Sequence, residues 1–383
     1  MSKLHNDLAN CIRFLSIDAV QKANSGHPGM PMGMADVATV LFKNFLRFNP
    51  KNPDWLNRDR FVLSAGHGSM LLYSLLYLTG YKSISINNIK KFRQLNSICA
   101  GHPEYHPKTG IETTTGPLGQ GISNAVGFAI AEEILKNKLG KDLINHKTYV
   151  LAGDGCLMEG ISHEAMSLAG HLKLKNLIVL FDNNKISIDG STSLSVSDNF
   201  KKRFESYGWD FQDVNGHNEK QISKAILKAS KSQRPSIISC KTVIGFGSPN
   251  KSGKSSSHGA PLGDDEINLT RKKLKWDHSA FDIPKDILNS WREIGLKGAE
   301  IESDWLKNLN SSNKNLKEAF NRTNNEIFLK DLNKVILQEK KKYFEEKPQM
   351  ATRQCSMKTI ESLTDILPNL IGGSADLSGS NNT

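Results

Sequence analysis

The sequence contains few cysteines and no long uninterrupted apolar segment. Its five cysteines are scattered through 383 residues and never occur as a C-x-x-C pair. This pattern argues against a disulfide framework or a structural zinc site and fits a reducing compartment, so we expect a cytoplasmic protein. No apolar run reaches the roughly 18–20 residues that span a bilayer. The first 24 residues form an amphipathic helical pattern without the apolar region of a signal peptide, so we expect no membrane partner.

The charge is unbalanced, with a formal net charge of +11. Many of the lysines lie between Lys201 and Lys347, where they alternate with Glu and Asn. Such a mixture is typical of solvated helix surfaces, and a second interpretation of the charge is attraction of small anionic molecules. A nucleic-acid surface is a third interpretation. The sequence has no basic patch interleaved with aromatic residues and no zinc-finger spacing, so we expect no nucleic-acid partner.

Strand-like and helix-like patterns alternate along the first two thirds of the chain. Three short apolar runs lack alternation, as buried parallel strands do, and they cover residues 148–152, 177–181 and 236–242. Helical patterns cover residues 121–138, before the first run, and residues 160–172, between the first and second runs. This order predicts an α/β fold with a doubly wound, mostly parallel sheet and helices on both faces.

The length of the chain predicts two or three domains. We expect residues 1–262 to form the α/β domain and residues 263–350 to form a helical extension and linker. Residues 351–383 read as the start of a second α/β domain, with a helix at 356–363 and a strand at 370–372. We expect that second domain to be incomplete, either because the chain is a fragment or because another polypeptide supplies the rest.

The strongest chemical motif is Gly153-Asp154-Gly155, which directly follows a predicted strand. Asn184 follows the next predicted strand, so the two side chains are expected at the same edge of the sheet. A carboxylate, an amide oxygen and a main-chain carbonyl form a hard ligand set that suits Mg²⁺ or Ca²⁺ bridging a diphosphate. The amino-terminal amides of the helix at 160–172 are expected to favour the anion. Without Asn184, the motif would read equally well as an ordinary turn.

Glycine-rich turns carry four histidines, His27, His67, His102 and His258. A single histidine is more often structural, but imidazoles grouped in loops suit proton transfer and hydrogen bonds to hydroxyl or phosphate groups. Residues 113–121 add a G-x-x-G-x-G loop before a helix, which by itself is weak evidence for any ligand. Residues 247–255 have five residues between their glycines where a nucleotide-binding P-loop has four, so we interpret them as a loop that carries His258.

Together these segments resemble the transketolase family closely. The resemblance rests on SGHPG, LSAGHGSM, GHPEYHPKTGIETTTGPLGQGISNAVG, GDGCLMEGISHEA, DNNKISIDG, SHGAPLG, MATRQCS and LIGGSADLSGSNNT, which run in family order from residue 25 to residue 383. It implies a thiamine-diphosphate-binding fold and transfer of a two-carbon ketol unit from a ketose phosphate to an aldose phosphate, as in the pentose phosphate pathway. It also implies sugar phosphate substrates, and a homodimer or a complementing C-terminal half as partner.

The resemblance implies a role for each matching residue. The metal ligands would be Asp154, Asn184 and the carbonyl of Ile186. Thiamine diphosphate would be bound by His67, Gly116, Leu118, Gly155, Asn184, His258 and Asp376. The catalytic residues would be His27, His102 and His258, and these three would also contact substrate together with Arg353 and Ser380. Glu159 would lie at the subunit interface.

Some features depart from the family pattern or leave alternatives open. The turn at residues 215–218 has asparagines where aspartates are common, and we expect this to alter a structural turn and not catalysis. The family's activating glutamate would lie beyond Thr383, so we expect the chain alone to be weakly active or inactive. The alternatives are a non-catalytic or split-gene cofactor-binding subunit, or a related thiamine enzyme such as dihydroxyacetone synthase or deoxyxylulose-phosphate synthase.

Overall fold

The computed structural model describes residues 2–324, 328–367 and 369–383. The chain divides into two compact units, Met1–Asn308 and Leu309–Thr383. The first unit therefore continues beyond residue 262 and includes part of the segment that we expected to be an extension. The predicted domain limits themselves stay predictions.

A five-stranded parallel sheet forms the centre of the first unit, with strand order β1-β2-β3-β7-β6. Its strands are β1 (Arg60–Leu63), β2 (Thr148–Gly153), β3 (Leu177–Asn183), β6 (Asp210–Asn215) and β7 (Ser236–Lys241). A small antiparallel pair, β4 (Ile186–Ser187) and β5 (Gly190–Ser191), lies apart from it. The α/β prediction is confirmed.

Two strands of the five-stranded sheet were not predicted, for different reasons. β1 has only four residues, too few for a clear pattern. β6 has the sequence DFQDVN and lies at the edge of the sheet, where most of its residues keep some exposure to solvent. By contrast, residues 177–181 of the central strand β3 are all 0% exposed, which explains their continuous apolar run.

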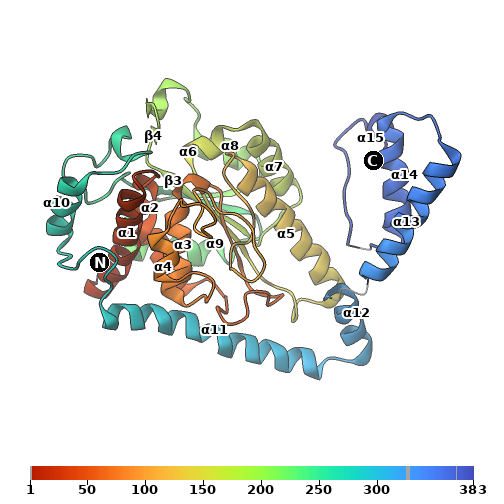
Figure 1. Ribbon diagram of the computed structural model, residues 1–383, viewed down its shortest axis with the longest axis horizontal. Helices are drawn as coiled ribbons and strands as arrows, with labels where there is room; N and C mark the ends of the chain where they lie inside the picture. Colours follow the sequence, from red (N-terminus) through yellow and green to blue (C-terminus); the bar gives the residue numbers. More distant parts are fainter. Residues whose placement is uncertain (1, 325–327, 368) are drawn as a thin grey trace. The chain divides into compact units, whose positions relative to one another are not determined.

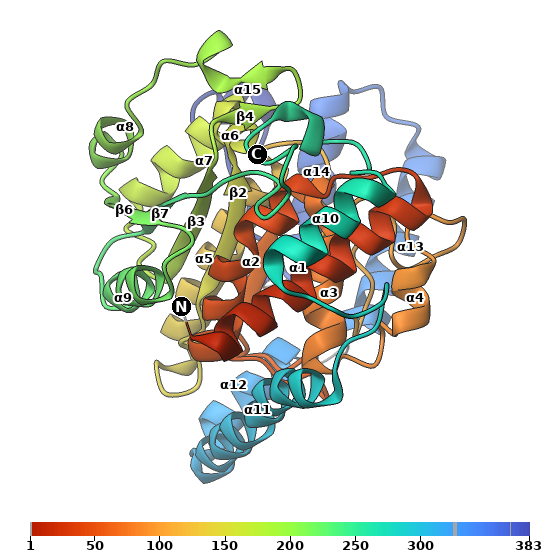
Figure 2. The same cartoon turned by 90° about the vertical axis from the view of Figure 1, so that its left-hand side faces the viewer.

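Helices cover both faces of the sheet (Figure 1), with α1, α2 and α9 on one side and α5 and α7 on the other. Figure 2 shows α1, α2 and α3 packed side by side. The helices that lie wholly or mainly in this unit are α1 (Lys3–Ala23), α2 (Gly29–Asn44), α3 (Ser69–Thr79), α4 (Ile86–Lys90), α5 (Gln120–Leu139), α6 (Asp154–Met158), α7 (Gly160–His171), α8 (Phe200–Ser206), α9 (Glu219–Ala229), α10 (Asp264–Leu274) and α11 (Lys285–Ser311).

The predicted amino-terminal helix is confirmed as α1. It begins after Ser2, whose hydroxyl accepts a hydrogen bond from the His5 amide at 3.2 Å. It ends at Asn24, which adopts the left-handed conformation at φ 48° that commonly terminates helices. None of the helices in the described ranges combines the length and apolar character that crossing a membrane requires.

The segment after β2 differs from the prediction in one respect. The short helix α6 begins at Asp154 itself, so it separates the strand from α7. The expected anion contact with the amino-terminal amides of α7 therefore does not follow from the strand–helix connection. Asp154 is instead the first helical residue after the strand.

The second unit is helical in its described residues, with α12 (Lys314–Asn324), α13 (Phe328–Glu346), α14 (Thr352–Thr364) and α15 (Ser378–Asn381). The predicted helix at 356–363 is confirmed within α14, which packs against α13. The predicted strand at 370–372 is wrong: Leu370 and Ile371 are exposed, at 45% and 58%. A strand needs a neighbouring strand for its backbone hydrogen bonds, and the described residues of this unit supply none.

Candidate functional site

Parallel pairing brings four chain segments to one edge of the sheet. β1, β2, β3 and β7 are neighbours, and each is followed at its carboxyl end by a polar or glycine-rich segment. The register pairs Gly153 of β2 with Asp182 of β3, and Asp182 with Cys240 of β7. In open α/β sheets ligands bind at this edge, so the residues that follow these strands are placed to form a site.

A cavity of about 290 Å³ lies at this edge. Nine of the predicted site residues line it: His27, His67, Gly116, Leu118, Asp154, Gly155, Asn184, Ile186 and His258. They come from segments far apart in the sequence, and the fold alone brings them together. A larger and more open groove of about 900 Å³ lies between α1 and α10, but it contains none of the predicted residues.

Part of the cavity lining is rich in oxygen atoms. Asp154 is only 5% exposed, and its carboxylate accepts a hydrogen bond from the Lys185 amide at 3.2 Å. The Asn184 side chain donates to Asp182 Oδ2 at 2.8 Å, and its oxygen accepts from the Ile186 amide at 2.9 Å. This pairing fixes the Asn184 oxygen on the side of the Ile186 backbone.

For the two carboxylates, Asp154 and Asp182, burial outweighs the hydrogen bonds that they accept. Burial, together with the charge of Asp182, raises the pKa of Asp154 to about 7. Burial also raises the pKa of Asp182 to about 6, although Thr242 and Asn184 donate hydrogen bonds to it. A divalent cation would remove this penalty, because an opposite charge favours the ionised form.

The ligand chemistry also fits a hard cation. In the described residues, no cluster of three His, Cys, Asp or Glu side chains could hold a metal by itself. The predicted set is different in kind, because it combines the Asp154 carboxylate, the Asn184 amide oxygen and the Ile186 carbonyl at the wall of one cavity. Such oxygen ligands suit Mg²⁺ or Ca²⁺, and a diphosphate can supply the remaining positions.

Three histidines also line the cavity and lie close to one another. The ring centroids of His67 and His258 are 5.1 Å apart with an interplanar angle of 17°, and His27 lies 5.1 Å from His67 and 5.8 Å from His258. Burial, followed by the charges of neighbouring imidazoles, lowers the pKa of His67 to about 3 and that of His27 to about 4. These rings are therefore neutral near pH 7.

Neutral imidazoles leave defined donors and acceptors for a ligand. Arg93 Nη2 lies 3.4 Å from His27 Nδ1 and can only donate, so Nδ1 accepts and the ring proton of His27 lies on Nε2. Arg93 Nη1 also donates to the Ser25 hydroxyl at 2.8 Å, which fixes the guanidinium. The buried Nδ1 of His258 has no hydrogen-bond partner among the residues that the structure describes. A buried polar atom of this kind is expected to meet a ligand or ordered water.

The glycine-rich loop packs tightly against the segment that carries His67. A methyl group at Gly66 would lie 2.7 Å from the Thr115 hydroxyl and 2.8 Å from the Gly116 amide, so only glycine permits this approach. His102 does not line the cavity. It packs behind Gly116, where a methyl group on Gly116 would lie 3.4 Å from its ring, and its backbone carbonyl accepts from the Tyr73 hydroxyl at 3.3 Å.

Four further predicted residues lie outside the cavity wall. Glu159 is exposed and occupies the position before α7. Arg353, Asp376 and Ser380 are exposed residues of the second unit. The functional roles given to all the site residues stay predictions.

The structure adds residues that the motifs did not single out. Asp182 faces the cavity from the carboxyl end of β3, and its position beside Gly153 in the register could have been inferred from the strand pairing. Met30, Ile188 and Ile244 supply apolar wall, and Arg93 orients His27. No sequence signal identifies these four, because their positions depend on the paths of loops.

Comparisons with known proteins agree with this geometry. Residues 4–328 match the family model "Transketolase, thiamine diphosphate binding domain". The transketolase of Rhodobacter capsulatus is 53% identical over 379 residues, covering 99% of this chain and 56% of that protein. Transketolase 2 of Escherichia coli is 51% identical over 388 residues, covering 98% of this chain and 57% of that protein.

Solved structures give the same result. The crystal structure of transketolase from Campylobacter jejuni has a TM-score of 0.90 at 44% identity and covers all of this chain and 58% of that one. A mutant transketolase of Pichia stipitis in complex with xylulose 5-phosphate has a TM-score of 0.88 at 38% identity, covering 100% of this chain and 57% of that one. The chain thus spans somewhat more than half the length of these relatives, and it belongs to the transketolase family through its thiamine-diphosphate-binding domain.

Proposed function

We propose that this chain provides the diphosphate-binding half of a transketolase active site. The reaction would move a two-carbon ketol unit from a ketose phosphate to an aldose phosphate. One observation carries the proposal: nine residues matched to the family's site line a single cavity at the carboxyl edge of the sheet. The Pichia stipitis relative in complex with xylulose 5-phosphate supports a sugar phosphate as substrate.

The oxygen-rich part of the cavity lining would hold the cation and the diphosphate. Asp154, Asn184 and the Ile186 carbonyl would bind Mg²⁺ or Ca²⁺, and Gly155 and His258 would contact the diphosphate. Thiamine diphosphate, when bound, would supply the stabilised carbanion that this transfer needs. The apolar side chains of Leu118 and Ile244 would shield the cofactor from water.

The histidines would orient substrate and hold protons at defined atoms. His27 Nε2 carries the ring proton and can donate to a substrate oxygen, because Arg93 occupies Nδ1. Within the described part of the chain, His258 Nδ1 has no partner, so it can accept or donate once its tautomer is set by the ligand. Because burial keeps both rings uncharged near neutral pH, they can exchange protons with hydroxyl groups and not merely attract anions.

We further propose that two copies of the chain associate through the surface of α7. Ile161, Leu168 and Leu172 are exposed there at 38%, 46% and 45%, and Glu159 adjoins them. Exposed apolar groups of this kind commonly mark protein interfaces. A cytoplasmic location is supported by the five free cysteines, four of them buried.

A transfer assay tests the proposed activity. Xylulose 5-phosphate and ribose 5-phosphate would be incubated with thiamine diphosphate and Mg²⁺, using this chain alone and this chain mixed with the remaining C-terminal portion of the Rhodobacter capsulatus relative. We expect transfer in the mixture and little transfer by the chain alone, because the chain spans 56% of that relative.

Two controls make the result interpretable. The C-terminal portion alone must be inactive, and omission of thiamine diphosphate must abolish the signal. Calorimetry would show whether the chain binds thiamine diphosphate with Mg²⁺. A mixture that binds the cofactor and assembles, yet transfers no ketol unit, would overturn the proposed activity.

A further inference from the structure

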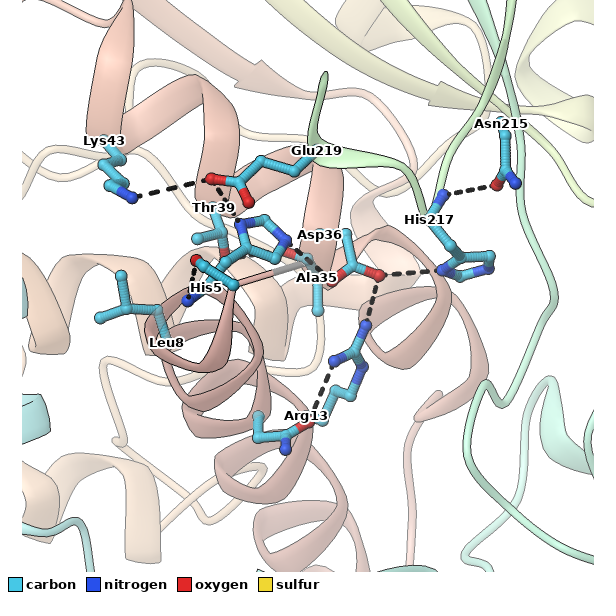
Figure 3. Close-up of polar contacts among 12 residues, drawn as sticks. His5, Leu8, Arg13, Ala35, Asp36, Thr39, Lys43, Asn215, His217 and Glu219 are labelled. Atoms are coloured by element: carbon cyan, nitrogen blue, oxygen red, sulfur yellow. Dashed lines mark hydrogen bonds and ion pairs between the residues drawn. The ribbon is translucent and has the colours of Figure 1, made fainter. Parts of the chain in front are cut away.

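A buried polar cluster lies outside the cavity, where α1, α2 and the turn before α9 meet (Figure 3). Asp36 is at its centre and is 0% exposed. One carboxylate oxygen accepts from His5 Nε2 at 3.1 Å. The other accepts from Arg13 Nη2 at 2.6 Å and from His217 Nδ1 at 2.9 Å. The carboxylate is therefore fully engaged by three side chains.

His217 connects this cluster to another part of the chain. The Val243 amide donates a hydrogen bond to His217 Nε2 at 3.0 Å. An amide can only donate, so Nε2 is an acceptor and the ring proton lies on Nδ1, which donates to Asp36. The ring also stacks on Phe246, with centroids 4.0 Å apart and an interplanar angle of 21°. Both nitrogens and one face of the ring are thus occupied, which fixes its orientation.

The residues that follow Val243 form a wall of the cavity. Ile244 lines it, and Gly245 donates its amide to the Gly29 carbonyl at 2.9 Å. A methyl group at Gly29 would lie 2.5 Å from both the Ile244 side chain and the Ser257 carbonyl, so Gly29 packs directly against that side chain and against the Ser257 backbone. Gly29 lies two residues after His27, and Ser257 directly precedes His258.

We propose that His217 is a positioning residue for the cofactor site. Through the Val243 amide it holds the segment 243–258 against Gly29, and so sets where Ile244, His258 and His27 lie around the cavity. This inference rests on the proposed function and assigns a role to the turn at 215–218, for which the sequence suggested only a structural one. His217 lies 181 positions after Asp36 in the sequence.

Matched substitutions remove the two hydrogen bonds of the His217 ring one at a time. His217→Asn keeps an amide donor near the Nδ1 position and loses the acceptor for Val243. His217→Gln keeps an acceptor near the Nε2 position and loses the donor to Asp36. His217→Ala loses both, and Lys231→Gln, at an exposed position in the turn after α9, is the control.

The proposal predicts that His217→Asn and His217→Gln rank in one order for cofactor affinity and in the opposite order for thermal stability. Affinity of the 383-residue chain for thiamine diphosphate with Mg²⁺ is expected to fall about five- to tenfold in His217→Asn and His217→Ala, and about twofold or less in His217→Gln. Thermal stability is expected to fall in His217→Gln and His217→Ala, and little in His217→Asn. A purely structural role would make both measurements follow the same order, and that result would overturn the proposal.

Hydrogen exchange distinguishes this inference from the proposed function. In the chain without cofactor, amides of the segment 243–258 are expected to exchange faster in His217→Asn than in His217→Gln, and Lys231→Gln is expected to exchange as the wild type does. Equal exchange in these variants would overturn the positioning role. Failure of the wild-type chain to bind thiamine diphosphate, with the exchange difference intact, would instead count against the proposed function.

Discussion

Replacing Asp154 with asparagine tests the proposed cation site most directly. The carboxylate is 5% exposed and lies near Asp182, and both effects raise its pKa to about 7. An unfolded aspartate has a pKa of about 3.9. We therefore expect Asp154→Asn to stabilise the metal-free chain while it removes metal-dependent binding of thiamine diphosphate.

The pKa gives both the magnitude and the direction of this effect. Because the folded-state pKa is raised, the group costs no stability below about pH 4, and its cost grows as pH rises from about 4 to about 7. At about 1.4 kcal/mol for each pKa unit, the cost above pH 7 is on the order of 4 kcal/mol. The hydrogen bond from the Lys185 amide is weakened by asparagine, so the expected net gain is about 2–4 kcal/mol.

Urea denaturation at pH 8 in the presence of EDTA measures this gain. Asp142→Asn, at an exposed position in the turn before β2, is the matched control and is expected to leave stability unchanged. Adding Mg²⁺ and thiamine diphosphate is expected to stabilise the wild type and not Asp154→Asn. A metal-free Asp154→Asn that is less stable than the wild type at pH 8 would refute the reasoning.

Three further predictions follow from buried groups. Burial opposes the charge of Asp36, but Arg13, His217 and His5 outweigh it and hold its pKa far below the usual value, so Asp36→Asn is expected to cost about 3–5 kcal/mol in urea at pH 7. The stabilising effect of the ionised Asp36 carboxylate is lost only as pH falls below about 4. Equal stability of the wild type and Asp36→Asn at pH 7 would contradict the expected cost. The lowered pKa of His67, about 3, means that stability rises with pH between about 3 and 6.5, and His67→Gln is expected to flatten that slope by up to about 1.4 kcal/mol per pH unit. Gly66→Ala is expected to cost about 1–3 kcal/mol and to weaken thiamine diphosphate binding, because its methyl group meets the Gly116 amide; calorimetry with unchanged affinity would rule this out.

Much of the fold was predictable because its signals are local. The continuous apolar runs of β2, β3 and β7 reflect burial on both faces, and a run of adjacent residues suffices to identify them. The edge strand β6 escaped prediction because a half-exposed strand tolerates polar residues. The strand expected at 370–372 failed for the opposite reason, since an apolar run forms a strand only when a partner is available for its backbone.

Some features of the site were likewise predictable from local motifs, and others depend on the fold. The sequence by itself determined that Asp154 and Asn184 follow adjacent strands, and that glycines accompany His27, His67 and His258, because each pattern lies within a few residues. Only the tertiary structure decided that these three histidines meet at one cavity and that Ile244 lines its wall. These placements depend on contacts between segments far apart in the chain, and such contacts are fixed by packing, which leaves no periodic trace in the local sequence.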